Sequence, residues 1–305
     1  MSRIIVSGSV AFDRIMDFSG LFGDYFVPEK AHSINLSFEV QNVSLQFGGT
    51  AGNVAYSLAL LGEKPEIIAT VGNDFASYRS HLLLAGVDSG SIRVIETAPT
   101  ASAYVFTDKS DNQIAAFHPG AGATAYDTPI DTDGRALAII SPGCVADMTY
   151  LPGYYRLHNL RYLYDPGQQI PVLSGDVLKD GIKGAHILFA SDYELALIMK
   201  KTELSEEEII EQVDVLVVTF GAQGSHVITK AGRVDVHASP ARAVLDPTGA
   251  GDAYRAGFIK GILAGLSHEE SARLASVVSA CVVEQYGTQK HTFTMSDLAD
   301  RYRKT

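Results

Sequence analysis

The amino-acid sequence predicts an α/β fold, in which helices cover both faces of a mostly parallel sheet and a small β-sheet forms a lid. Three observations predict this. Short apolar runs bounded by turn residues recur along the first two thirds of the chain. Segments with helical periodicity alternate with these runs, which indicates crossovers between parallel strands. Two segments of alternating polar and apolar residues interrupt that rhythm.

The strands of the main sheet are expected where apolar runs lie between turn residues. These runs are Arg3–Ser7, Glu66–Val71, Leu137–Ser141, Tyr162–Asp165, His186–Ala190 and Val215–Thr219. Helical periodicity predicts helices at Asn53–Leu61, Ala76–Ala85, Tyr193–Lys200 and Ser205–Gln212. The last third turns mainly helical, with further helices expected at Gly251–Leu263 and His268–Glu284.

The lid is expected from two segments that alternate at a period of two. The stretch SINLSFEVQNVSLQF ends at residue 47, and TASAYVFTDKSDNQIAAF occupies residues 100–117. The residues DKSDN split the second segment into two strands of a hairpin. Since no linker-like stretch divides the chain, we expect one domain over residues 1–305, with lid segments at about residues 14–46 and 100–118. Such a sheet can cover an active site, and its apolar face can also bind a partner.

Composition and charge exclude several classes of protein. The formal net charge of −11 argues against general affinity for nucleic acid or for anionic membranes. The two cysteines, Cys144 and Cys281, belong to no metal-binding pattern or disulfide framework, which fits a reducing compartment. The apolar run at the N-terminus is too short for a secretory signal, and no run approaches the roughly 18 apolar residues of a membrane span. We therefore expect a cytoplasmic protein.

The stretch DPTGAGDAYRAGF has the features of an anion-binding helix start. Three small residues, Gly249, Ala250 and Gly251, precede the carboxylate of Asp252. The first amides of a helix lack intrahelical partners, and small side chains let an anion approach them. A carboxylate beside such an anion hole can accept a proton from an attacking hydroxyl, which suits phosphoryl transfer. The same residues would also suit a helix that Thr248 caps and whose dipole Asp252 merely complements.

A second glycine-rich stretch, FGGTAGNVAYSLALLG, lies much earlier in the chain. Gly48, Gly49 and Gly52 precede Asn53, and an apolar helix follows. The backbone is again bare at a helix start, beside an amide side chain that can donate and accept hydrogen bonds. Taken alone, the stretch equally suits a tightly packed turn from strand to helix.

Together and in this order, the two stretches resemble the signature motifs of the ribokinase (PfkB) family of sugar and nucleoside kinases. The resemblance spans nearly the whole chain. It implies a ribokinase-like, three-layer α/β/α fold and ATP-dependent phosphorylation of a hydroxymethyl group, with Asp252 as general base and Gly249–Gly251 as anion hole. By contrast, the P-loop pattern and the G-x-S-x-G pattern of hydrolases are both absent.

The pieces SGSVAFD, LSFEV, QIAAFHPGA, DPGQQ and SDYE are similar to those of actinobacterial-type adenosine kinases. That likeness implies transfer to the 5′-hydroxyl of adenosine, giving AMP. It implies that Asp13 and Asn53 hold the ribose hydroxyls and that Gly49 lines the sugar. It places around the purine Ser9, Ser37, Phe117, Gln168 and Gln169. From the residues alone, Phe117 equally suits the lid core, and the two glutamines equally suit a solvated turn.

The nucleotide side is implied by two further pieces. VVTFGAQGS resembles the strand and loop that hold ATP, with contacts from Thr219, Gly221 and Gly224, although these glycines would also serve a plain β-turn. SDYE stands where the family has Asn-x-x-Glu, so Glu194 matches and Ser191 replaces the asparagine. The likeness implies ATP and Mg²⁺, with nucleotide contacts also from Ser191 and Gly251. Glu194 would reach the metal through water, because magnesium keeps much of its hydration shell.

Several alternatives stay open from the sequence. The acceptor could be another nucleoside or a free sugar, ribose or fructose, and a non-catalytic nucleotide sensor would keep the same fold. Relatives of this kind form homodimers through the lid, which implies the same here. Dependence on a monovalent cation such as K⁺ is common in the family, and the sequence does not decide it.

Overall fold

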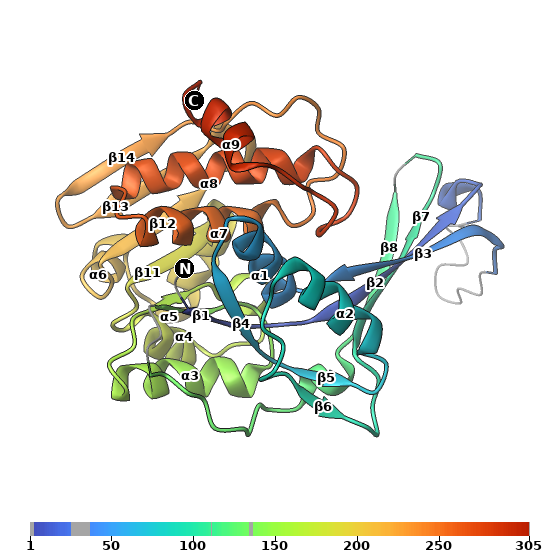
Figure 1. Ribbon diagram of the computed structural model, residues 1–305, viewed down its shortest axis with the longest axis horizontal. Coiled ribbons are helices and arrows are strands. Elements are labelled where there is room, and N and C mark those ends of the chain that lie inside the picture. The colour runs from blue at the N-terminus through green and yellow to red at the C-terminus, as the bar shows by residue number, and fades with distance from the viewer. Residues whose placement is uncertain (1–2, 26–36, 111, 134–136, 305) are drawn as a thin grey trace.

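The computed structural model describes residues 3–25, 37–110, 112–133 and 137–304. Its body is built on an eight-stranded sheet with the order β14-β13-β12-β11-β10-β9-β1-β4 (Figure 1). These strands are β1 (Arg3–Ser7), β4 (Lys64–Ile68), β9 (Leu137–Ile140), β10 (Tyr162–Tyr164), β11 (Ile187–Ser191), β12 (Val215–Thr219), β13 (Ser225–Thr229) and β14 (Gly232–Val236). Neighbours from β4 to β12 pair in parallel, and β13 and β14 add an antiparallel edge. The predicted mostly parallel sheet is confirmed.

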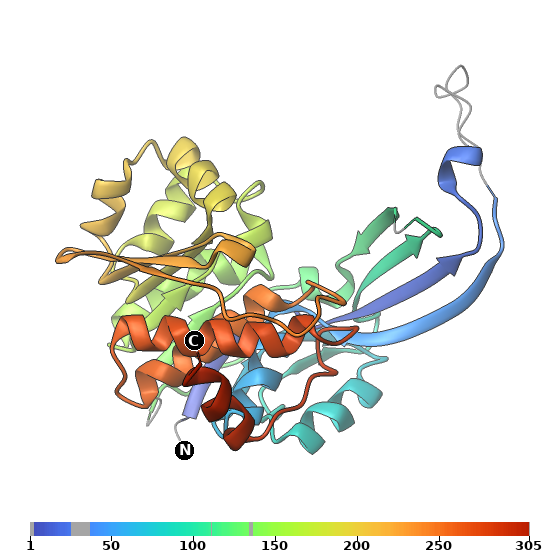
Figure 2. The ribbon, with the colours of Figure 1, turned by 90° about the horizontal axis from the view of Figure 1, so that it is seen from above.

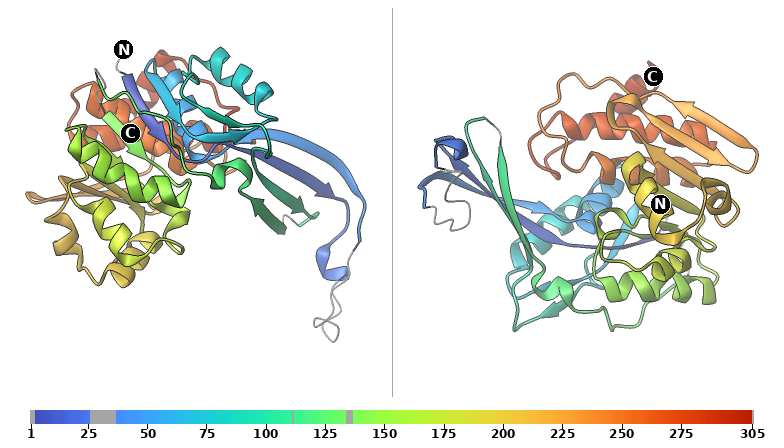
Figure 3. Two further views of the ribbon diagram at one scale, coloured as in Figure 1. Left: turned by 90° about the horizontal axis from the view of Figure 1, so that it is seen from below. Right: turned by 180° about the vertical axis from the view of Figure 1, so that it is seen from behind.

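Helices cover both faces of this sheet (Figures 1 and 3). One face carries α1 (Thr50–Leu60), α2 (Ala76–Ala85), α7 (Ala250–Leu263), α8 (His268–Val283) and α9 (Met295–Tyr302). The other carries α3 (Val145–Leu157), α4 (Gly175–Ile182), α5 (Asp192–Thr202) and α6 (Glu206–Ile210). Along β1, Ile4 and Val6 enter one apolar core while Ile5 enters the other. The parallel strands are therefore buried on both sides, as is usual for parallel sheets.

A separate four-stranded sheet, the lid, projects from the body (Figure 2). Its strands are β2 (Ala11–Phe18), β3 (Val40–Gly48), β7 (Ala101–Thr107) and β8 (Gln113–His118), in the order β3-β2-β7-β8. The predicted hairpin between β7 and β8 is confirmed. Residues 26–36 of the expected lid lie outside the described residues. Asp13, Ala103 and Phe117 pair across the lid and share its inner face.

Some elements differ from the sequence prediction. The helices α3, α4 and α9 are additional to those predicted, and α3 contains Pro152, a residue that usually ends helices. The predicted strand Glu66–Val71 is wrong as one element, since β4 ends at Ile68 and a short strand β5 (Thr70–Gly72) pairs with β6 (Arg93–Ile95) instead. No helix in the described part of the chain is both long and apolar enough to cross a membrane.

Candidate active site

A cavity of about 1230 Å³ opens between the lid and the body. Its wall includes Ser9 after β1, Thr70 after β4, Asp165 after β10, Ser191 at the end of β11 and Thr219 at the end of β12. The cavity therefore lies at the carboxyl ends of the parallel strands, where open α/β sheets usually bind their ligands. Its volume is above the usual range for one small-molecule site, so it has room for two substrates side by side.

Most of the predicted site residues line this cavity. They are Ser9, Asp13, Gly49, Asn53, Phe117, Gln168, Gln169, Ser191, Glu194, Thr219, Gly249, Gly251 and Asp252. Ser37, Ala250, Gly221 and Gly224 are not part of the cavity wall. Ser37 is exposed just before β3, and the two glycines lie in the β12–β13 loop, where both have positive φ. Their positive φ angles explain both glycines as turn residues of this loop.

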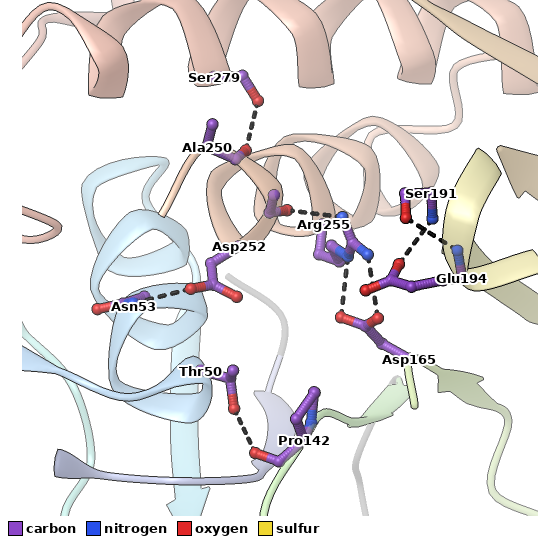
Figure 4. A network of polar contacts seen from close by, with 11 residues as sticks. Thr50, Asn53, Pro142, Asp165, Ser191, Glu194, Ala250, Asp252, Arg255 and Ser279 are labelled. Carbon is purple, nitrogen blue, oxygen red and sulfur yellow. Dashed lines mark hydrogen bonds and ion pairs between the residues drawn. The ribbon is translucent and has the colours of Figure 1, made fainter. Parts of the chain in front are cut away.

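Asp252 lies in the first turn of α7 and meets Asn53, which is buried in α1 (Figure 4). The side-chain amide of Asn53 donates a hydrogen bond from Nδ2 to Asp252 Oδ2 at 2.8 Å. Burial raises the pKa of Asp252 to about 7, with Asp165 and Asp13 adding to the rise while Asn53 and Arg255 oppose it. A carboxyl group with this pKa is about half ionised near neutral pH, which is the range in which a general base works best.

The backbone at the start of α7 leaves amide groups open to an anion. The amides of Gly251 and Asp252 have no acceptor within the described residues, whereas Ala250 N donates to Pro247 O at 3.2 Å. Thr248 is not the N-cap: the helix is preceded by Gly249 in the left-handed region, with φ of 80° and no side-chain cap. A Cβ on Gly249 would be strained there and would come within 3.0 Å of the Thr288 side chain. The amide of Ala250 is thus occupied, while those of Gly251 and Asp252 remain open to an anion.

Asp13 projects from lid strand β2 into the same cavity. Burial, together with the nearby charge of Asp246, raises the pKa of Asp13 to about 6. Because it is only partly desolvated and lies across the cavity from the body, its carboxylate can accept hydrogen bonds from a ligand held under the lid.

On the opposite side of the cavity, Ser191 and Glu194 form a capping box at the start of α5. Ser191 N donates to Glu194 Oε2 at 2.7 Å, and Glu194 N donates to Ser191 Oγ at 3.2 Å. The serine that departs from the family motif thus caps a helix, which a serine does well. The other carboxylate oxygen of Glu194 makes no hydrogen bond among the described residues.

Sequence reasoning missed a buried ion pair in the cavity wall, between Asp165 after β10 and Arg255 in α7 (Figure 4). Arg255 donates from Nε and Nη2 to the two oxygens of Asp165 at 2.9 and 3.0 Å, and from Nη1 to Gly251 O at 3.2 Å. The side chains are only 7% and 4% exposed. Although burial opposes its charge, the Asp165 carboxylate raises the pKa of Arg255. The signal in the sequence was an arginine among the small and apolar residues Ala253–Phe258.

The donor set fits a metal ion only in part. Among the residues that the structure describes, no three acidic, histidine or cysteine side chains lie close enough together to hold one. Both oxygens of Asp165 are taken by Arg255, which leaves one oxygen of Glu194. Magnesium commonly binds one or two carboxylates, water and substrate phosphates, so this arrangement suits an ion that arrives with a nucleotide.

Comparison with known proteins finds relatives along the whole chain. The model of the pfkB family of carbohydrate kinases matches residues 8–294. A nucleoside kinase from Methanothermobacter thermautotrophicus is 32% identical over 305 residues, which cover 98% of this chain and 95% of the relative. A nucleoside kinase from Methanocaldococcus jannaschii is 28% identical, covering 100% of this chain and 98% of the relative.

Solved structures agree with this. The Methanocaldococcus jannaschii nucleoside kinase, described as an archaeal member of the ribokinase family, superimposes with a TM-score of 0.90 at 28% identity, over 100% of this chain and 99% of that one. The nucleoside kinase of Burkholderia thailandensis in complex with inosine superimposes with a TM-score of 0.86 at 32% identity, over 99% and 96% of the two chains. A further structure of that enzyme is in complex with ADP-inosine. The ribokinase-like fold is confirmed.

Proposed function

Since the chain belongs to the pfkB family of carbohydrate kinases and is a phosphotransferase, we propose that it transfers the γ-phosphoryl group of ATP to the 5′-hydroxyl of a nucleoside. We propose adenosine as the acceptor and AMP as the product. The observation that carries the proposal is Asp252, which is held by Asn53 beside the two amides at the start of α7 in a cavity large enough for two substrates. The nucleoside kinases of similar sequence along the whole chain support a nucleoside as acceptor.

In the proposed reaction, the acceptor hydroxyl attacks the γ-phosphorus and Asp252 takes its proton. The new oxygen–phosphorus bond forms as the bond to the β-phosphate oxygen breaks, and ADP leaves with that electron pair. The amides of Gly251 and Asp252 stabilise the charge on the transferred group. Magnesium would neutralise charge on the phosphates, with Glu194 reaching it through water. Positioning and charge stabilisation provide most of the catalysis.

The acceptor would lie under the lid. Asp13 and Asn53 would hold the ribose and Gly49 would line it. Asn53 Oδ1 accepts from Gln289, and one Nδ2 hydrogen of Asn53 is donated to Asp252. Only the second Nδ2 hydrogen therefore remains for the sugar. Gln169 donates to Gly143 O at 2.8 Å, so its Oε1 remains for a base N–H group. The other residues proposed to surround the purine are Ser9, Ser37, Phe117 and Gln168.

The nucleotide would lie on the other side of the start of α7. The residues proposed to contact it are Ser191, Glu194, Thr219, Gly221, Gly224 and Gly251. Cys144 and Cys281 are free thiols, which suits the reducing cytoplasm where ATP is available. We therefore propose that the protein acts in the cytoplasm.

An acceptor panel tests the proposal. Purified protein with Mg-ATP is expected to release ADP with adenosine at a kcat/KM far above that with ribose or fructose, because only a nucleoside fills the base side of the cavity. Inosine is the second candidate, since a similar enzyme has been solved with it bound. Product mass identifies the phosphorylated acceptor, and parallel reactions with and without K⁺ measure cation dependence. Equal rates with free sugars would contradict the proposal, and absence of ADP release with every acceptor would indicate a sensor.

We also propose that two copies associate through the outer face of the lid. Register places Val43, Leu45, Tyr104 and Ile114 on that face, and they are 66, 49, 38 and 40% exposed. Light scattering is expected to give about twice the chain mass of 32.7 kDa. A charge in an apolar interface is costly, so Leu45→Glu should give the monomer mass. A monomer mass for the unaltered protein would exclude the dimer.

A further inference from the structure

Gln289 lies in the segment that follows α8, far from the cavity motifs in sequence, and it is only 4% exposed. Its Nε2 donates to Asn53 Oδ1 at 3.0 Å and to the Tyr78 hydroxyl, while its Oε1 lies 3.0 Å from His81 Nε2. It therefore joins α1 and α2 to the segment between α8 and α9. Every hydrogen-bonding atom of this buried amide has a partner, which is the condition under which a polar network fixes a single arrangement.

The direction of each hydrogen bond follows from the partners. Tyr78 donates to Gly48 O at 2.7 Å, so its oxygen must accept from Gln289. Burial lowers the pKa of His81, so its ring is neutral at pH 7, and the Nε2 tautomer donates to Gln289 Oε1. With Nε2 of Gln289 facing Asn53, the Asn53 oxygen must accept. The amide nitrogen of Asn53 is thereby turned toward Asp252.

The surrounding residues hold Gln289 in this orientation. The His81 ring lies between Phe47 and Tyr56, at centroid distances of 4.4 and 5.3 Å and with interplanar angles of 21° and 10°. Gly52 leaves room for the network, since a Cβ there would come within 3.1 Å of Gln289 Nε2 and still closer to the Tyr78 hydroxyl. This explains a glycine of the second motif that faces no ligand in the proposed reaction.

We propose that Gln289 is a positioning residue for the reaction: it prevents Asn53 from rotating its amide, so that Nδ2 rather than Oδ1 meets the carboxylate of Asp252. The reverse arrangement would bring two acceptors together unless Asp252 carried a proton. Gln289 thus keeps the base aligned and favours its ionised form. This inference rests on the proposed role of Asp252.

The other charged groups near Asp252 stay unchanged in the test. They are Asp13 from the lid, Asp165 after β10 and Arg255 in α7, and Tyr78 lies behind Asn53 in α2. The base is active when ionised, so kcat/KM of the unaltered enzyme is expected to rise as pH increases through about 7. The midpoint of that rise reflects the pKa of Asp252. A change in the midpoint in a Gln289 variant therefore reports a change in the orientation of the Asn53 amide.

The test compares Gln289→Glu with Gln289→Met. A glutamate has the same shape but only accepts, so it should draw Asn53 Nδ2 toward itself and turn Oδ1 against Asp252. At pH 7 we expect kcat/KM to fall by roughly 10- to 100-fold, the range for small misplacements near reacting groups. The midpoint should move to higher pH, with much of the rate recovered there. Methionine removes the donor but does not favour the reversed Asn53 amide. The fall in kcat/KM and the shift of the midpoint should therefore both be smaller.

Matched controls separate positioning from folding. Gln212→Glu adds the same charge just after α6, where the side chain donates to Glu208 O, and should leave rate and midpoint unchanged. Thermal unfolding and binding of a non-hydrolysable ATP analogue report whether each variant is folded. If both Gln289 variants unfold, Tyr78→Phe removes a single acceptor of Gln289 and should shift the midpoint in the same direction, but less.

The outcomes are distinct. An unchanged midpoint in the folded variants, or a rate loss that is equal at every pH, would overturn the role of Gln289. If Asp252→Asn itself keeps normal turnover, it is the proposed function of Asp252 that fails. If Asp252→Asn loses turnover while the Gln289 variants keep the normal rate and midpoint, the proposed function stands and only the positioning role of Gln289 fails.

Discussion

Replacing Asp252 by asparagine is expected to lower kcat by about 10²–10⁴-fold, the usual contribution of a positioned general base. Asparagine has nearly the same shape, and its Oδ1 can still accept the hydrogen bond that Asn53 donates at 2.8 Å. The geometry of the cavity should therefore survive while proton transfer is lost. ADP release in the presence of adenosine measures kcat, and calorimetry with a non-hydrolysable ATP analogue measures nucleotide affinity, which should change little.

The stability of this variant serves as its control. Burial raises the pKa of Asp252 to about 7, so the folded state disfavours its charge; this cost grows as pH rises from the unfolded pKa and is complete above about 7. Removing the charge should leave the melting temperature equal or higher at pH 8. The exposed Asp300→Asn in α9 removes only a surface ion pair with Arg303, so it should leave the rate unchanged and the stability nearly so. Turnover near the normal level in Asp252→Asn would remove the carboxylate from the mechanism.

Local sequence pattern predicted much of the fold. The strands β1 and β12 and the helix α2 begin and end where the pattern placed them. Each of these elements shows a single sequence pattern, that of a strand or that of a helix, and turn residues bound it. The pattern failed where one local rule opposed another. Pro152 inside α3 hid a helix whose packing against the sheet outweighs the loss of a backbone hydrogen bond.

The site was predictable where its parts are adjacent in sequence, as with Gly251 and Asp252. It was not predictable where the chain brings single polar residues together. Asp165 and Arg255 are 90 positions apart, and Asn53 and Gln289 are 236 positions apart. A lone glutamine in a loop has no periodicity or spacing that marks it. Its partners follow only from the packing of α1, α2 and the segment after α8.

Breaking the Asp165–Arg255 pair is expected to have the largest effect on stability. Arg255→Met would leave the Asp165 carboxylate buried without its partner, and it would also remove the contact of the guanidinium with the Phe189 ring, at 5.3 Å. Removal of one member of a buried pair costs about 3–5 kcal/mol in free energy of unfolding. Urea unfolding at pH 7 measures this loss. Turnover should fall as well, because Arg255 holds the carbonyl of Gly251 at the start of α7.

Two comparisons decide whether the uncompensated charge is the cause. Asp165→Asn combined with Arg255→Met removes the charge and should recover much of the lost stability. In the single Arg255→Met variant, burial without a cation raises the pKa of Asp165 further, so stability should recover as pH falls and the carboxyl takes a proton. A loss that is the same in the single and double variants and independent of pH would mean that Arg255 stabilises the fold by packing alone, since lost contacts do not titrate.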